Sequence, residues 1–324
     1  MVKGFWEKLK KPIFVLAPMA NVTDQAFRTI ITKYGKPDVF WTEFVSVEGF
    51  LSEGKKALLP DFWYSENQRP IVAQIFGSKP EQFELVAKEL VEMGFDGIDI
   101  NMGCPDKNVC KQGSGASLCK EPELTNEIIL ATKAGAGNTP VSVKARLGWN
   151  TNEIDTWLPV LLKASPAAIV MHARTKKQMS KVPADWSQIK KMVEITRELI
   201  SEEKERPILI GNGDVLSLDD GLKKISETGV DGVMLGRAIF GNPYLFNRDK
   251  KMEDLSIKER LDILLEHTDL FEKLYGEDPR IKGFDIMKKH YKAYVNGFDG
   301  AKELRIRLME AKDVSEIKGV IERM

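Results

Sequence analysis

Short apolar runs rich in β-branched residues alternate with helical patterns along most of this chain. Runs such as VSVKARL and AAIVMHA stay apolar almost to their last residues, which is typical of strands covered on both faces in a parallel sheet. Eight such units lie within residues 1–246, close to the size of a (β/α)8 barrel. The pattern therefore predicts an α/β fold, a (β/α)8 TIM barrel. A doubly wound sheet is the alternative, but it would typically carry an early G-x-G-x-x-G turn.

The boundaries of the expected elements follow from the same pattern. Strands are predicted near Ile13–Met19, Val39–Phe44, Ile71–Gly77, Gly97–Gly103, Val141–Leu147, Ala168–Ala173, Ile208–Gly213 and Gly232–Gly236. The clearest intervening helices are predicted at Glu81–Met93, Glu123–Lys133, Glu153–Lys163, Trp186–Ser201 and Leu218–Thr228.

The strand signals stop after Phe246, and only helical spacing continues toward the C-terminus. Helices are predicted at Ser256–Tyr275, Arg280–Val295 and Ala301–Glu310. The chain is therefore expected to hold two domains, a barrel over residues 1–246 and a small all-helical C-terminal domain over residues 247–324.

The charge changes sign within the predicted helical domain. Residues 253–278 contain nine acids and three bases, a net charge of −6, whereas residues 279–307 contain eight bases and three acids, a net charge of +5. The switch favours one acidic and one basic face, although most charge runs are simply solvated helix surfaces.

The composition excludes several classes of protein. The formal net charge is zero, so the charge balance alone does not indicate a nucleic-acid partner. Three cysteines without Cys-x-x-Cys spacing exclude a disulfide framework and argue against zinc, so no metal is expected. No run approaches the ~20 apolar residues of a membrane span, and the start MVKGFWEKLKKP lacks the apolar core of a signal peptide. We expect a cytoplasmic monomer with reduced thiols and no membrane partner.

The segment GIDINMGCPDKNVCKQGSGASLC, residues 97–119, begins as a buried strand and breaks at Gly103. Pro105 fixes its own φ and disfavours the helical region for Cys104, so this cysteine is displayed in a turn after a strand. A lone cysteine in such a turn is more often a small buried side chain than a reactive group. A rigid strand followed by a polar loop is nevertheless how catalytic groups are presented, and Cys104 is the first candidate.

Polar or charged residues stand at nearly every predicted carboxyl strand end, which is where barrels of this class place their active sites. These ends carry Pro18, Met19, Glu43, Gln74, Asn101, Cys104, Lys144, Arg146, His172, Arg174, Asn212, Gly213, Gly236 and Arg237. One such residue is easily a satisfied core side chain, but many coincident polar ends are costly to bury without partners. The pattern predicts one active site at this end.

The last two strand ends are rich in glycine. The motifs GNGD at residues 211–214 and GRA at residues 236–238 leave bare backbone amides after the seventh and eighth strands, where barrels commonly bind phosphate. Arg237 would add a charge-assisted hydrogen bond. Either glycine turn alone would be weak support, but the two together predict a phosphorylated ligand or cofactor.

With these residues in place, the chain closely resembles the flavin-dependent tRNA-dihydrouridine synthases. The similar segments span the predicted barrel in order: APMANVTDQAFR (17–28), TEFVS (42–46), VAQIFGS (72–78), IDINMGCPDKNVCKQGSGASL (98–118), VKARLGW (143–149), MHART (171–175), IGNGD (210–214) and GVMLGRAIFGNPYLF (232–246). The segment KGFDIMKKHYKAY, residues 282–294, resembles the helical-domain signature of the same family.

The resemblance implies an FMN enzyme that uses NADPH to reduce uridines of tRNA to 5,6-dihydrouridine. By it, the FMN positions are Pro18, Met19, Gln74, Lys144, His172, Asn212, Gly213, Gly236 and Arg237. Asn101 matches a residue that contacts the target uracil, and Cys104 matches the catalytic cysteine that gives a proton to C5 after hydride reaches C6. A thiol of ordinary pKa, ~8.5, is mostly protonated at neutral pH and suits a general acid.

An RNA substrate would be attracted by the basic segment of the helical domain, residues 279–307. Arg280, Lys282, Lys288, Lys289, His290 and Lys292 are expected to contact the RNA backbone. Arg174, in the loop after His172, is expected to lie near the RNA substrate. Phe284, Met287 and Tyr291 would then form the packed face of the helix. A merely solubilising face is the competing interpretation.

The loop after His172 departs from the family pattern, with Ser180 in place of the usual Tyr and Val182 in place of Gly. Recognition of the RNA is therefore less defined by the sequence than the reaction is. The alternatives are an FMN barrel acting on a free pyrimidine, an enzyme acting on ribosomal RNA, and an RNA-binding barrel without catalysis.

Overall fold

The computed structural model describes residues 2–278 and 281–323. Within them, eight parallel strands form one sheet in the order β1-β8-β7-β6-β5-β4-β3-β2. Strand β1 (Ile13–Leu16) pairs with β8 (Gly232–Leu235), and a parallel bridge from Val15 to Val39 sets it beside β2 (Phe40–Ser46). The remaining strands are β3 (Ile71–Phe76), β4 (Gly97–Met102), β5 (Val141–Arg146), β6 (Ala168–His172) and β7 (Ile208–Asn212). The sheet is a closed barrel, and the predicted fold is confirmed.

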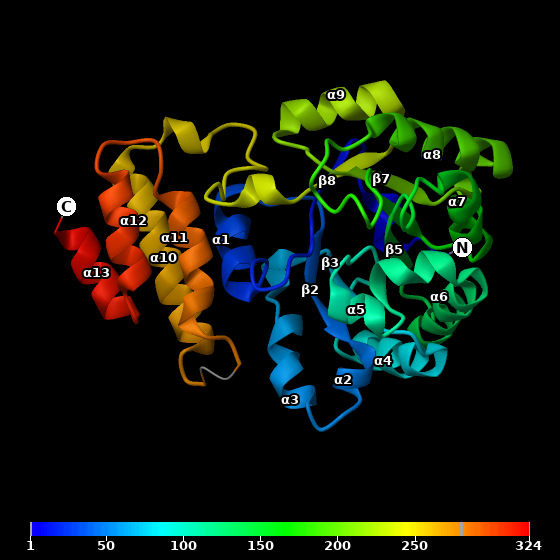
Figure 1. Ribbon diagram of the computed structural model, residues 1–324, viewed down its shortest axis with the longest axis horizontal. Helices are drawn as coiled ribbons and strands as arrows, with labels where there is room; N and C mark the ends of the chain where they lie inside the picture. Colours follow the sequence, from blue (N-terminus) through cyan, green and yellow to red (C-terminus); the bar gives the residue numbers. More distant parts are fainter. Residues whose placement is uncertain (1, 279–280, 324) are drawn as a thin grey trace.

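Helices cover the outside of the barrel (Figure 1). The longer ones are α1 (Gln25–Gly35), α4 (Pro80–Glu92), α6 (Pro122–Ala136), α7 (Ile154–Lys163), α8 (Trp186–Leu199) and α9 (Leu218–Thr228). Three short helices lie in the connections: α2 (Val47–Phe50), α3 (Lys55–Leu58) and α5 (Lys107–Lys111). The five helices expected between the strands are present within a few residues of their predicted bounds.

The continuous apolar runs reflect a sheet that is buried on both faces. Along β1, Ile13 and Val15 belong to the cluster inside the barrel, whereas Phe14 and Leu16 pack under the surrounding helices. Successive side chains of a strand point to opposite faces, so each strand must supply apolar residues to both clusters. This double burial explains why the strands lack apolar–polar alternation.

Four helices follow the barrel and are called the helical domain below: α10 (Ile257–Tyr275), α11 (Lys288–Tyr294), α12 (Ala301–Glu310) and α13 (Val314–Glu322). Figure 1 shows these helices beside α1 on one side of the barrel, and α10 contacts α1 directly. Helix α10 begins with a capping box, in which Ser256 and Glu259 each accept the other's backbone N–H. No helix of the described residues is long and apolar enough to span a membrane.

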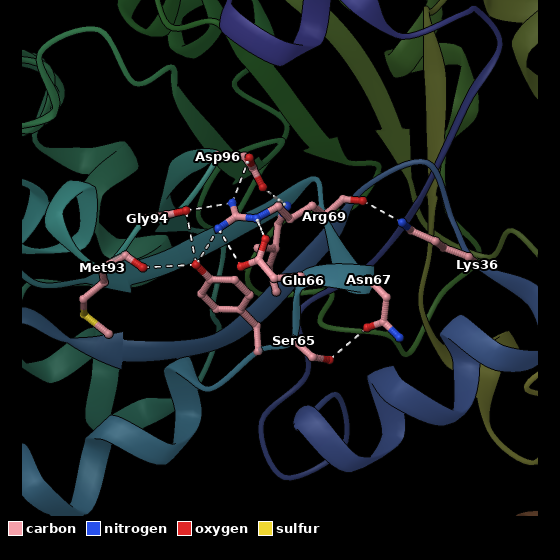
Figure 2. Close-up of polar contacts among 10 residues, drawn as sticks. Lys36, Ser65, Glu66, Asn67, Arg69, Met93, Gly94 and Asp96 are labelled. Carbon is pink, nitrogen blue, oxygen red and sulfur yellow. Dashed lines mark hydrogen bonds and ion pairs between the residues drawn. The ribbon is translucent and has the colours of Figure 1, made fainter.

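The N-terminal ends of the strands, here called the floor, are held by polar contacts to neighbouring loops. Asp38 accepts the Phe14 N–H at 2.7 Å, and Asp96 accepts the Ile71 N–H at 2.8 Å. Figure 2 shows Arg69 between Glu66, Gly94 and Asp96, with its guanidinium bonded to all three. Such contacts fix the strand starts and the loops before them.

Candidate active site

The carboxyl ends of the strands, here called the mouth, surround a cavity of about 660 Å³. That volume lies in the range of small-molecule and cofactor sites. The cavity brings together every barrel residue assigned to a site from sequence: Pro18, Met19, Gln74, Asn101, Cys104, Lys144, His172, Arg174, Asn212, Gly213, Gly236 and Arg237. Side chains and loops that are far apart in the sequence thus face one space.

A chain of hydrogen bonds fixes the side-chain amides at the ends of β3 and β4. The Gln74 amide donates to the buried Asp99 carboxylate at 2.7 Å and accepts from the Asn101 amide at 3.1 Å. The Asn101 oxygen in turn accepts the backbone N–H groups of Gly103, at 3.1 Å, and Cys104, at 2.9 Å. Because each member of the chain orients the next, Asn101 holds the turn that presents Cys104.

The Cys104 turn is closed by backbone contacts that need glycine. The Cys104 carbonyl accepts the Ala116 N–H at 3.0 Å. Gly115 has φ +61°, and a Cβ there would lie 2.9 Å from that carbonyl oxygen. Burial is the main cause that raises the pKa of the Cys104 thiol above its ordinary value. Cys104 therefore faces the cavity as a thiol and not as a thiolate at neutral pH.

Lys144 and His172 place two nitrogens at the ends of β5 and β6. The Lys144 ammonium donates to Asn212 Oδ1 at 3.2 Å. Burial, with some repulsion from Arg146, lowers the Lys144 pKa to about 8. Burial followed by the neighbouring cations lowers the His172 pKa well below its ordinary value, so the ring is neutral. Lys144 thus supplies a poorly solvated positive charge and His172 an uncharged ring.

The two glycine-rich ends lie side by side, because β7 and β8 are paired. Gly213 has φ +124°, and a Cβ there would lie 2.9 Å from Ala184 Cβ and 3.2 Å from the His172 ring. Gly236 precedes a 3-10 helix (Arg237–Ile239), whose first N–H groups have no acceptor within the helix. A Cβ on Gly236 would have only ordinary contacts, the nearest at 3.6 Å. The loop therefore leaves backbone donors beside open space.

Asp214 links two arginines at this corner of the cavity. It forms an ion pair with Arg174, and its other oxygen accepts from Arg237 at 2.7 Å. Arg174 is buried, whereas the Arg237 side chain is 64% exposed. Burial would raise the Asp214 pKa, but the Ala184 N–H and the two arginines outweigh it and lower that pKa. Two cations against one carboxylate leave this corner positive, which fits a phosphate group.

Arg174 lines the cavity and is bonded to three partners within the protein. Its Nε donates to the Val182 carbonyl at 2.6 Å, its Nη1 lies 3.1 Å from His172 Nε2, and its Nη2 pairs with Asp214. With all these partners inside the protein and little exposed surface, Arg174 organises the mouth.

The residues of the helical domain that were expected to bind RNA differ in their exposure to solvent. Arg280 lies outside the described residues. Lys289 and Lys292 are exposed on α11, and Lys288 is bonded to Asp285 at 2.6 Å. Lys282 and His290, in contrast, are buried, so the prediction that these two side chains contact RNA phosphates is wrong.

Lys282 instead joins the helical domain to the barrel. Its ammonium lies 2.7 Å from a carboxylate oxygen of Glu43, at the end of β2, and 2.7 Å from one of Asp61. Burial opposes the ammonium, but the two carboxylates outweigh burial and raise the Lys282 pKa. Glu43 also accepts the backbone N–H of Asn21, in the loop that carries Met19 into the cavity.

His290 packs between the two domains. Its ring centroid lies 4.6 Å from Phe27 of α1 and 4.6 Å from His267 of α10. Burial lowers the His290 pKa to about 3, so the ring is neutral. Neither of its nitrogens has a hydrogen-bond partner among the described residues. The basic segment KKHYK, residues 288–292, thus includes a histidine that belongs to the core, His290.

Glu43 and Arg146 were expected from sequence only as polar strand ends, and Asp99 and Asp214 were given no role of their own. Asp99 precedes Asn101 by two positions, so strand periodicity places both on one face, and that signal could have been used. Arg146 donates to the Gly103 carbonyl at 2.7 Å and to the Met179 carbonyl at 2.9 Å. Its role depends on two loops meeting in space, which the sequence does not display.

No group of three or more His, Cys, Asp or Glu residues in the described chain has the geometry to hold a metal ion. The groups present are instead amides, cations, a thiol and backbone N–H donors. This donor set suits a planar organic ligand with a phosphate.

Comparisons with known proteins agree with this geometry. The chain matches the family described as "Dihydrouridine synthase (Dus)" over residues 15–323. It is 41% identical to the "Probable tRNA-dihydrouridine synthase" of Staphylococcus aureus (strain MRSA252), over 99% of this chain and 96% of that protein. It is 40% identical to the "Probable tRNA-dihydrouridine synthase 2" of Bacillus subtilis (strain 168), over 99% of this chain and 97% of that protein.

Solved structures of low sequence identity share the fold. Morphinone reductase superposes with a TM-score of 0.53 at 12% identity, covering 76% of this chain and 87% of that one. Histamine dehydrogenase from Rhizobium sp. 4-9 superposes with a TM-score of 0.54 at 15% identity, covering 79% of this chain but 48% of that one. These similarities extend to the barrel architecture alone.

Proposed function

The chain belongs to the dihydrouridine synthase family and is an enzyme, and from this premise we propose that it reduces uridines of tRNA to 5,6-dihydrouridine with FMN and NADPH. The proposal includes a monomeric enzyme of the cytoplasm. The observation that carries it is the cavity at the mouth, where a half-buried thiol, a half-buried lysine and two glycine-rich donor loops face one another.

The residues present fit FMN. The positive corner at Arg237, with the free N–H groups after Gly236 and the close-packed Gly213, would hold the phosphate. Lys144 and His172 would lie against the isoalloxazine, and Gln74 would offer amide donors and acceptors. When bound, FMN carries hydride from NADPH to C6 of the uracil.

Cys104 supplies the proton that C5 requires. Its raised pKa keeps hydrogen on the sulfur at neutral pH, and the Asn101 bonds to the turn fix where that sulfur points. Asn101 lies beside it and would position the uracil edge. Because the cavity is walled by the strand ends, a target base must leave the RNA stack to enter it.

Lys144 adds a fixed positive charge where negative charge develops during reduction. Removing that charge from water during folding is costly, and the lowered pKa records this cost. A preorganised charge of this kind stabilises a transition state without reorganisation at the moment of reaction. His172, being neutral, contributes hydrogen bonding and packing.

The proposal is tested by reconstituting the purified protein with FMN and incubating it with NADPH and unmodified tRNA. Dihydrouridine is measured by mass spectrometry of the nucleosides, with free uridine and ribosomal RNA as parallel substrates. We expect product in tRNA that requires both cofactors. Product only from free uridine or only from ribosomal RNA would replace the proposed substrate, and absence of FMN binding would overturn the proposal.

A further inference from the structure

A tryptophan held by two lysines stands at one side of the mouth. The ammonium of Lys120 lies 4.5 Å from the Trp149 ring centroid, and that of Lys176 lies 4.3 Å from the same centroid. The two lysines come from different loops, after β4 and after β6. Like charges held around one indole repel each other, and an anion placed near both would relieve that repulsion.

These two lysines belong to a larger basic surface. The loops after β4 and β6, residues 104–120 and 173–184, contain one acid, Asp106. They also contain the six lysines that we call the lysine rim: Lys107, Lys111, Lys120, Lys176, Lys177 and Lys181. In a chain of zero net charge, this is a strong local excess of positive charge.

The lysine rim lacks carboxylate partners. Elsewhere Lys191 lies 2.6 Å from Asp155, and Lys282 lies 2.7 Å from Glu43. Within residues 2–278 and 281–323, no ion pair involves any of the six rim lysines. Surface lysines without carboxylate partners across a whole rim are available to bind phosphates.

The loop that carries Lys176 and Lys177 is firmly attached. Their backbone N–H groups donate to the carbonyls of Gly148 and Trp149, each at 2.9 Å. Buried Arg146 donates to the Gly103 carbonyl and to the Met179 carbonyl, so it joins the Cys104 turn to this loop. The rim is therefore a preformed surface that is physically connected to the position of the thiol.

The position of the rim complements that of the helical domain. Helix α1, against which α10 packs, connects β1 to β2. In the strand order of the closed barrel, β5 and β6 lie farthest from β1 and β2. The loop after β6 thus lies on the side of the mouth opposite the helical domain, and the loop after β4 lies nearer to the middle. Figure 1 shows α7, between β5 and β6, on the side of the barrel away from the helical domain.

We propose that the lysine rim binds the phosphates of the RNA strand on the side of the mouth away from the helical domain. The inference rests on the proposed function, because an RNA whose base enters the cavity must cross both sides of the mouth. The rim would supply affinity without base specificity, since phosphate contacts do not distinguish sequence. Through Arg146, binding there would also hold the Cys104 turn in place.

The test compares two double variants of the FMN-loaded protein for binding to a fluorescently labelled unmodified tRNA at salt concentrations from about 50 to 200 mM KCl. The rim variant is Lys176→Gln with Lys177→Gln. The matched control is Lys8→Gln with Lys10→Gln, which removes two exposed lysines near the floor. We expect the rim variant to bind at least about fivefold more weakly, with the salt slope reduced by about 0.7 to 0.9 for each phosphate that is no longer neutralised.

A third variant, Lys176→Arg with Lys177→Arg, separates charge from packing. It is expected to bind RNA as the unchanged protein does. Equal binding and salt slope in the rim, control and unchanged proteins would overturn the inference, and so would an arginine variant as weak as the glutamine one. If the unchanged protein neither binds nor modifies RNA, the proposed function itself fails, which is a separate result.

Discussion

At the floor of the barrel, the Arg69 guanidinium is bonded to Glu66, Gly94 and Asp96, whereas at the mouth the half-buried Lys144 has one side-chain bond, to Asn212, among the described residues. Other polar groups show the same contrast between full bonding at the floor and exposure to a cavity at the mouth. Floor carboxylates such as Asp38 and Asp96 accept the N–H groups that begin neighbouring strands. Mouth donors face a cavity of about 660 Å³.

The difference shows which polar groups serve stability and which serve chemistry. A polar group that is fully bonded within the protein contributes to folding and has nothing left to offer a ligand. A buried group with spare bonding capacity costs stability and is retained where it binds something. Barrels of this architecture concentrate the first kind at the floor and the second at the mouth.

The largest effect is expected at the mouth. Cys104→Ala should slow dihydrouridine formation by about 10² to 10⁴-fold, the usual contribution of a positioned general acid. The free energy of unfolding and the reduction of bound flavin by NADPH should change little, because the thiol is half-buried and its loss removes one sulfur atom from the edge of an open cavity. Single-turnover rates with pre-reduced protein and tRNA measure the effect.

The matched control for that variant is Cys119→Ala. Burial raises the Cys119 pKa to about 12, and this residue does not line the cavity. It should leave the rate nearly unchanged. Equal losses in both variants would show that the cysteines act through folding and would remove proton donation from the account.

Lys282 sharpens the comparison, because it lies near the mouth yet is fully bonded. Lys282→Met leaves buried Glu43 without its partner and should destabilise the protein by about 3–5 kcal/mol. Denaturant unfolding measures this destabilisation. Adding Glu43→Gln, which removes the unpaired charge, should restore part of the stability. A Lys282→Met protein of unchanged stability with weaker, less salt-dependent RNA binding would favour the RNA contact expected from the sequence.

At the floor, Arg69→Met should lower stability and leave the chemistry intact. The variant cannot form the bonds to Gly94 at 2.7 Å and to Asp96 at 3.0 Å, and hydrogen bonds to charged groups are worth about 1.5–3 kcal/mol. The side chain is partly exposed, so the lower end of that range is expected in denaturant unfolding. A rate defect per folded molecule would contradict the division between the two ends.

The last effect in this comparison concerns pH and Lys144. Its pKa is about 8 when the flavin-free protein is folded and 10.5 as the reference for the unfolded chain. Between these values the unfolded chain binds more protons than the folded one, so stability rises with pH. Below pH 8, Lys144 is protonated in both the folded and the unfolded chain, so the folded protein bears the full cost of burying its charge. Relative to Lys144→Met, the flavin-free protein should therefore gain melting temperature as the pH rises from about 8 to about 10, and a constant difference would show an unperturbed lysine.

The strands were predictable because most strands contribute side chains to two apolar clusters, one on each face of the sheet. Their sequences are therefore continuous apolar runs. Helix α1 was not predicted, although Asp24 caps it by accepting the Phe27 N–H and Ile30 and Ile31 lie on its buried face. Helix α13 was missed as well. Both helices are short, with 11 and 9 residues, so few positions define their helical periodicity.

The site was predictable to the extent that strand ends reveal it. Because the topology of a parallel barrel brings these ends together, the residues at the strand ends line one cavity, except for Glu43, which pairs with Lys282. The errors at Lys282 and His290 arise from long-range contacts. The Glu43 partner of Lys282 lies 239 positions away, and His290 is buried against Phe27 of the barrel. Residue type alone cannot show whether a cation meets solvent or a distant carboxylate.

The central claim, that ligand chemistry belongs to the mouth and stability to the floor, is tested most directly by one dissociation constant. FMN is titrated into flavin-free Arg237→Ala and Arg69→Met proteins and into the unchanged protein, under conditions where all three are folded. Losing the Arg237 partner of the phosphate should weaken FMN binding by about tenfold, as a charge-assisted hydrogen bond predicts, and Arg69→Met should bind as the unchanged protein does. Unchanged affinity in Arg237→Ala, or an equal loss in Arg69→Met, would contradict the account.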